Sequence, residues 1–120
     1  MTYSIDYCDD KECIKVAIRG ELTLDLLQKI ARDVATLANT NHCYRIINDL
    51  REAMLTAKAF EVLSMPQSAQ QSGVKQTFQR ALIVGDRKET FKFLETVFIN
   101  QGHIVKMFST CEEGLAWLHE

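Results

Sequence analysis

The sequence predicts an α/β domain in the order ββαβαβαβα, with a mainly parallel five-stranded sheet, one antiparallel edge strand and helices that cover the sheet. Two observations predict it. Short apolar or alternating segments typical of strands recur along the chain, and all but the first are followed by residues with apolar side chains at helical spacing. Such alternation favours parallel strands joined by right-handed crossovers. The 120 residues contain no repeat or linker, so we expect residues 1–120 to form one domain.

The first two strands should form an antiparallel hairpin. Residues 3–8 alternate apolar and polar side chains, and residues 13–19 form the second strand after an acidic turn. Gly20 ends the hairpin, Thr23 can cap the first helix, and the polar residues 39–41 should break that helix. The stripe expected to face the sheet is Leu24, Leu27, Ile30, Ala31, Val34 and Leu37.

The middle of the chain holds the third strand and the second helix. The strand covers residues 43–48 and ends before Asp49-Leu50-Arg51. Thr56 is a natural N-cap for the helix. Pro66 lacks an N–H, so we expect a bend or restart there and a polar end near residues 70–73. The predicted buried side of this helix includes Ala59, Phe60 and Leu63.

The C-terminal part adds two strands and two helices. Residues 80–84 form a continuous apolar run, which predicts a central strand buried on both faces. Gly102 is placed to end the third helix, residues 104–108 form the last strand, and Ser109 or Thr110 should cap the last helix. The side chains expected to bury these two helices are Phe91, Leu94, Val97, Phe98, Leu115, Trp117 and Leu118.

Composition and charge exclude several classes of protein. Hydrophobic residues make up 47% and charged residues 25%, the balance of a globular protein. A formal net charge of −2 gives no electrostatic reason to bind nucleic acid or an anionic membrane. No apolar run approaches the ~20 residues of a membrane helix, and the acidic N-terminus does not read as a signal peptide. We therefore expect a cytoplasmic protein without nucleic-acid or membrane partners.

The four cysteines are predicted to be free structural thiols. Cys8, Cys13, Cys43 and Cys111 would stay reduced in the cytoplasm, and no Cys-x-x-Cys pair provides the usual zinc spacing. His42 beside Cys43 is a weak indication of a metal site. We expect no metal and no cofactor.

No sequence motif indicates catalysis. The chain lacks GxSxG, GxGxxG, P-loop and HExxH motifs. Its histidines, His42, His103 and His119, lie before a strand, in a turn and at the C-terminus, and no signature ties any of them to a nucleophile. We therefore predict that the protein is not an enzyme.

The C-terminal third carries a family resemblance. The strand and turn RALIVGD at 80–86 are followed by a helix, a last strand at 104–108 and the sequence EEGLAWL at 112–118. This pattern resembles small bacterial proteins of the SpoIIAA-like group, which are related to the STAS domain and to SEC14-type folds.

Two earlier segments fit the same resemblance, and one residue departs from it. GELTLDLL at 20–27 and INDLREA at 47–53 match the group. Gly114 stands where the resemblance implies alanine, a change that weakens a helix by about 1 kcal/mol. The resemblance therefore covers nearly the whole chain and implies a SpoIIAA/STAS-like fold.

The resemblance also implies where a regulatory residue would lie. STAS domains that act as anti-anti-sigma factors carry an Asp-Ser-Ser-Gly-like motif, whose phosphorylated Ser switches partner binding. Thr56 lies about where that Ser would be, but Leu55 replaces the Asp and Lys58 replaces the Gly. A helix cap and a regulatory phosphosite both stay open for Thr56, and sigma-factor regulation is not carried over.

Asp49 and Arg51 form a second candidate site. They follow a buried strand at the carboxyl edge of the sheet, where open α/β folds place ligands. Residues two apart on an extended segment point the same way. The pair is either a salt bridge that pins the local structure or a polar contact to a partner.

Two binding functions follow from these observations. We predict a non-enzymatic STAS-like module that recognises a protein partner through Asp49, Arg51, Thr56 and Lys58. The alternative is a small apolar ligand or lipid carrier of SEC14-like type, which needs a cavity of roughly 300 Å³ or more. A chain of 120 residues can scarcely spare that volume. A homo-oligomer is compatible with either function.

Overall fold

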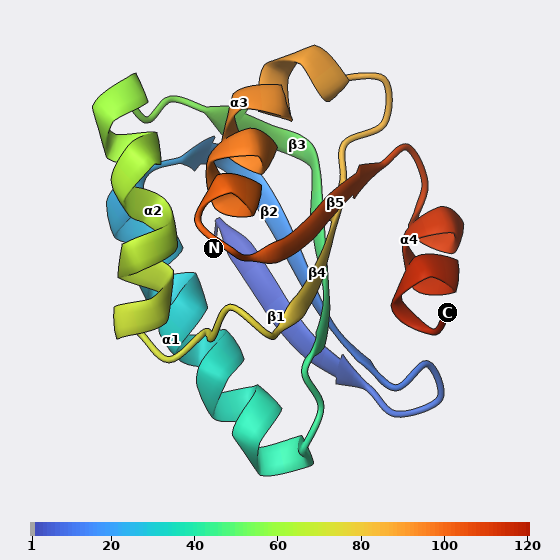
Figure 1. Ribbon diagram of the computed structural model, residues 1–120. Coiled ribbons are helices and arrows are strands. Elements are labelled where there is room, and N and C mark those ends of the chain that lie inside the picture. Colours follow the sequence, from blue (N-terminus) through green and yellow to red (C-terminus); the bar gives the residue numbers. More distant parts are fainter. Residues whose placement is uncertain (1) are drawn as a thin grey trace.

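The computed structural model describes residues 2–120 and gives the predicted order of strands and helices (Figure 1). The strands are β1 Tyr3–Cys8, β2 Cys13–Leu22, β3 Arg45–Leu55, β4 Gln79–Ile83 and β5 Ile104–Phe108. The helices are α1 Leu24–Asn41, α2 Ala59–Gln71, α3 Lys88–Asn100 and α4 Cys111–Leu118. None of the helices in this part of the chain has the length and apolar composition needed to cross a membrane.

The five strands form one sheet in the order β1-β2-β3-β4-β5. β1 pairs antiparallel with β2 and the other pairs are parallel, which confirms the predicted edge strand. Ile83 and Val84 have no exposed surface, as expected. β4 is an interior strand with neighbours on both sides, but the middle position belongs to β3.

The helices lie on both faces of the sheet, three on one and one on the other (Figure 1). Right-handed crossovers that always step the same way along a sheet keep their helices on one face, which explains α1, α2 and α3. The terminal α4 packs on the opposite face, over β3, β4 and β5. Helix α4 covers this second face only in part. Because β1 and β2 alternate their side chains, the part of the face that no helix covers carries polar residues. The side chains that these two strands turn that way include Ser4, Asp6, Lys15 and Arg19.

β3 is longer than the sequence predicts. It starts two residues later, at Arg45, and continues to Leu55 instead of ending at residue 48. Ala17 pairs with Asp49 but Arg19 pairs with Glu52, so β3 contains a bulge at this point. Asp49 and Arg51 therefore lie on a strand, and beyond the bulge β3 pairs with β2 alone.

Local capping signals place two helices as predicted. The Thr23 hydroxyl accepts a hydrogen bond from the N–H of Leu26 at 3.2 Å, and the Thr110 hydroxyl accepts one from the N–H of Glu113 at 3.2 Å. Residues 39–41 do not break α1, which runs to Asn41 and ends where His42 takes a left-handed φ of 52°. Gly102, with a φ of 87°, follows the end of α3 as expected.

The start of α2 corrects one prediction. Thr56 does not cap this helix, because the N-cap is Lys58 and the first helical residue is Ala59. The Glu61 carboxylate accepts a hydrogen bond from the backbone N–H of Lys58 at 2.9 Å and so fills the capping role. Thr56 lies before the helix in the connecting segment.

The buried side of α2 also differs from the one predicted from the sequence. Ala59, Phe60 and Leu63 are exposed. Of the bend or restart predicted at Pro66, the restart is wrong, since one helix continues through this residue to Gln71. The stripe that packs inward is Val62, Met65, Pro66 and Ala69.

Gly114 has a packing reason that the resemblance does not reveal. A Cβ at this position would lie 2.8 Å from Ile83 Cδ1 and 3.2 Å from Ala81 Cβ. The glycine therefore lets α4 approach the sheet closely over β4.

Trp117 lies at the margin of the core instead of inside it. Its ring packs on Phe108, with the ring centroids 5.6 Å apart, and the side chain is only half-buried. We expect Trp117→Ala to lower the free energy of unfolding by about 1–2 kcal/mol, below the ~3–5 kcal/mol of a fully buried aromatic. Urea unfolding measures this, with Phe93→Ala at an exposed α3 position as the control. A loss above ~3 kcal/mol would place Trp117 in the core.

Candidate functional site

Asp49 and Arg51 form a bidentate salt bridge. Arg51 Nε lies 2.9 Å from Asp49 Oδ1 and Arg51 Nη2 lies 2.7 Å from Asp49 Oδ2. These hydrogen bonds hold the pKa of the Asp49 carboxyl below its usual value. Arg51 Nη2 also lies 3.8 Å from Cys111 Sγ, which ties the pair to the first turn of α4. The local salt bridge is therefore present, while half of the Arg51 side chain stays exposed and free to contact another molecule.

A second arginine supports this edge of the sheet. Arg87, just before α3, donates from Nη1 to the carbonyl oxygens of Leu50 at 3.3 Å and Arg51 at 3.0 Å. These carbonyls are available because β3 has left β4 at this point. Sequence reasoning missed Arg87, since only the fold brings the start of α3 to the bulge in β3.

Thr56 and Lys58 lie apart from this pair, on the segment that enters α2. Both residues are exposed. Within residues 2–120, the Thr56 hydroxyl makes no hydrogen bond and Lys58 Nζ has no carboxylate in salt-bridge range. The structure therefore divides the four predicted site residues into two pairs. One pair faces α4 and is internally satisfied, and the other is free at the start of α2.

The residues around the start of α2 form an apolar surface that sequence reasoning missed. Phe60 and Leu63 are 68% and 53% exposed. Met54 is 52% exposed as well, but its neighbours Ala53 and Leu55 pack into the core under α1, α2 and α3, so Met54 points to the other face of the sheet. Phe60 and Leu63 are three residues apart on one helix and therefore adjacent on its surface. Together with Thr56 and Lys58 they are called the α2 surface below. The signal was present in the sequence as a second apolar stripe on α2, offset from the inward one.

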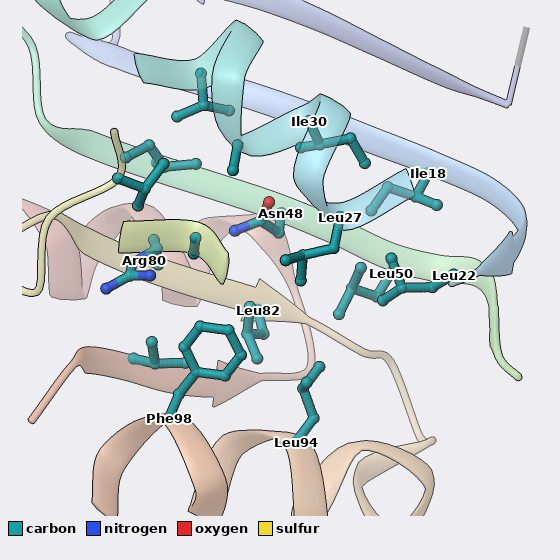
Figure 2. Close-up of a pocket in the computed structure, with 16 residues that line it drawn as sticks. Ile18, Leu22, Leu27, Ile30, Asn48, Leu50, Arg80, Leu82, Leu94 and Phe98 are labelled. Atoms are coloured by element: carbon teal, nitrogen blue, oxygen red, sulfur yellow. The ribbon is translucent and has the colours of Figure 1, made fainter. Parts of the chain in front are cut away.

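A small cavity lies between the sheet and the three helices, α1, α2 and α3, that cover one of its faces. Its volume is about 90 Å³, well below the roughly 300 Å³ of a pocket for a drug-sized or lipid ligand. Among the described residues that line it, Asn48 on β3 and Arg80 on β4 are the polar ones (Figure 2). The other lining side chains are apolar and come from four strands, β2 to β5, from the three helices α1, α2 and α3, and from Val74, and they include Ile30 of α1 and Phe98 of α3.

An open pocket of about 450 Å³, lined mainly by polar side chains, lies at the opposite end of the parallel strands, where β3 and β4 begin. His42 and Cys43, the weak metal indication, line it. Cys43 Sγ lies 3.4 Å from the carbonyl oxygen of Glu12, and no group of three His, Cys, Asp or Glu side chains within residues 2–120 is placed to hold a metal ion. Nearby, burial raises the pKa of the Cys13 thiol to about 11, so this sulfur is not a thiolate at neutral pH.

The overall architecture is similar to that of a protein of known structure, SpoIIAA, which is an anti-sigma factor antagonist. SpoIIAA in its unphosphorylated form superposes with a TM-score of 0.58 at 12% sequence identity, covering 98% of this chain and 97% of that chain. The phosphorylated form of SpoIIAA, a Bacillus cell fate determinant, gives a TM-score of 0.56 at 14% identity over 97% and 98% of the two chains. No protein-family model and no curated protein matches the sequence. The structural likeness confirms the SpoIIAA-like, STAS-related fold that the sequence motifs imply.

Proposed function

We propose that this chain is a non-enzymatic interaction module that binds a partner protein through the α2 surface. The observation that carries this proposal is the exposure of Phe60 and Leu63 beside a free Lys58. The fold adds support, since SpoIIAA is an antagonist of an anti-sigma factor and thus acts on another protein.

The chemistry of the α2 surface defines the partner. Aromatic and large apolar side chains that become buried on binding supply most of the energy of an interface. Phe60 and Leu63 would enter an apolar pocket of the partner, and Lys58 would meet a carboxylate at its rim. Arg51, with half of its side chain exposed, lies apart from this surface beside α4, so it would be a separate contact with the partner. Rim charges mainly set the rate and specificity of association.

Phosphorylation of Thr56 is not needed for this binding. The exposed hydroxyl is accessible, but Leu55 and Lys58 replace the acidic and glycine positions of the switch motif. The proposal therefore assigns Thr56 a contact role next to Phe60, with or without a phosphate.

The partner can be found and the interface measured in one series. A photo-crosslinking amino acid at position 60 should capture one protein in the native host, and both proteins are then purified. We expect Phe60→Ser to weaken the complex about thirtyfold, the loss of roughly 2 kcal/mol expected for an anchor residue. The melting temperature should stay nearly unchanged, because the side chain is mostly exposed. Calorimetric titration measures the dissociation constant.

Phe93→Ser is the matched control, because Phe93 is 46% exposed on α3, outside the α2 surface. This variant should bind as the wild type does. Equal weakening by both variants would indicate non-specific apolar contact and contradict the proposal. So would unchanged binding of Phe60→Ser and of Lys58→Glu.

A further inference from the structure

α1, α2 and α3 together form the roof of the cavity, which is not fully enclosed. The contribution of α2 is the smallest of the three. This helix packs against α1 and α3 but makes few contacts with the strands below it. Ala69 is the α2 residue that lines the cavity, and its small side chain leaves the space beneath the helix unfilled. The cavity is therefore partly a consequence of how α2 sits on its neighbours.

Asn48 faces this cavity from the middle of the central strand (Figure 2). Its carboxamide offers two donors and an acceptor, yet makes no hydrogen bond to any of residues 2–120. The Asn48 side chain is partly exposed, and the buried polar side-chain atom without a partner among residues 2–120 is His103 Nε2 and not an atom of Asn48. The amide is therefore accessible, and it can bond to a polar atom that enters the cavity.

Arg80 gives the cavity a positive charge. The residue is 6% exposed, and its guanidinium bonds only to neutral acceptors: the carbonyls of Phe78 and Lys75 and Nδ1 of His103. No carboxylate among residues 2–120 lies in salt-bridge range, and Nη1 makes no hydrogen bond to them. Burial lowers the pKa of Arg80 to about 10, so the group remains a cation at neutral pH. A buried cation is stabilised by an anion with which it can share hydrogen bonds.

We propose that the cavity binds a small monocarboxylate, with its carboxylate held by Asn48 and Arg80 and its tail among Leu27, Ile30 and Leu94. At roughly 15 Å³ for each water-sized atom, the 90 Å³ volume holds about six non-hydrogen atoms. Butyrate has this size. The apolar side chains that make up the rest of the lining suit an alkyl tail.

The test is an NMR titration of the full chain with sodium butyrate, and with 1-butanol as a neutral ligand of similar length. Butyrate should shift the side-chain amide signals of Asn48 and the methyl signals of Leu27, Ile30 and Leu82, with saturation. Butanol should bind at least tenfold more weakly, because it lacks the charge that complements Arg80. Saturable shifts confined to surface residues, or equal affinity for butanol, would overturn the proposal.

Two variants locate the binding site. Asn48→Leu keeps the volume but removes the amide, and Ala69→Leu fills the cavity from its roof. Each should weaken butyrate binding at least tenfold, while Asn100→Leu at the exposed end of α3 should leave it unchanged. Melting curves establish that the variants are folded. If folded Asn48→Leu and Ala69→Leu both bind butyrate as the wild type does, the site lies elsewhere and the proposal is wrong.

Discussion

Replacing Gly73 with alanine is expected to lower the free energy of unfolding by about 3 kcal/mol. Gly73 follows α2 with a φ of 108° and completes a Schellman motif. Its N–H donates to the carbonyl of Gln70 at 3.0 Å, and the N–H of Val74 donates to the carbonyl of Ala69 at 2.9 Å. An added Cβ would also lie only 2.8 Å from Ala35 Cβ on α1. Backbone strain and overpacking therefore act together at this position.

Gly20 separates the two causes. It has a φ of 85° on β2, but an added Cβ would meet no atom within 4 Å. Gly20→Ala should therefore cost only the backbone term of about 1–2 kcal/mol in urea unfolding. Combining Gly73→Ala with Ala35→Gly removes the clash and should recover at least ~1 kcal/mol relative to the sum of the single changes. Equal losses for Gly73→Ala and Gly20→Ala would show that the contact with α1 is irrelevant.

Structural features that depend on a few neighbouring residues are predicted well from the sequence. The hydroxyls of Thr23 and Thr110 cap their helices because a cap needs only a side chain and an N–H three residues on. Gly102 ends α3 for a similarly local reason. The order of the elements along the chain follows from their alternation, so it too is predictable. The order of the strands in the sheet is not fixed in this way, and β3 takes the middle position in place of β4.

The wrong predictions concern segments whose sequence is compatible with two different local structures. α2 has two apolar stripes, and hydrophobicity alone does not decide that Val62 and Met65 face inward while Phe60 and Leu63 face outward. The extension of β3 was equally hidden, because residues 49–55 look like a loop in the sequence, and only a β2 strand that reaches Leu22 pairs with most of them. Both errors concern the candidate site, which is why its apolar half was not predicted.

The interior polar groups could not be predicted for a different reason. Asn48 and Arg80 lie on segments correctly predicted as strands, but their facing one cavity depends on the register between β3 and β4. His103 reads as a turn residue, and only the fold buries it against Arg80. Tertiary packing, and not local preference, decides the environment of all three.

His103 should make the protein markedly less stable as the pH falls. The residue is 5% exposed, its Nδ1 accepts a hydrogen bond from Arg80 Nη2 at 2.6 Å, and its Nε2 is buried without a partner among residues 2–120. Burial, and to a lesser degree the nearby Arg80 cation, lower the pKa of His103 to about 4. The neutral imidazole is therefore the form that the fold accepts.

The sign of the effect follows from the two pKa values. In the unfolded chain a histidine has a pKa near 6.5, so below pH ~6.5 the unfolded state takes up a proton that the folded state does not. The free energy of unfolding then falls by about 1.4 kcal/mol per pH unit until pH ~4, where the folded protein is protonated as well. The total loss is about 3 kcal/mol. Most of it precedes the titration of ordinary carboxylates near pH ~4.

Urea unfolding between pH ~7 and ~5 measures this loss against His103→Gln, which keeps an acceptor for Arg80 but does not titrate. The wild type should lose about 2 kcal/mol more than the variant over this range. His42→Gln, at an exposed position, should follow the wild-type profile. If wild type and His103→Gln instead lose stability in parallel, His103 is protonated as readily in the folded protein as in the unfolded chain. Its burial against Arg80 would then have no effect on the stability of the fold.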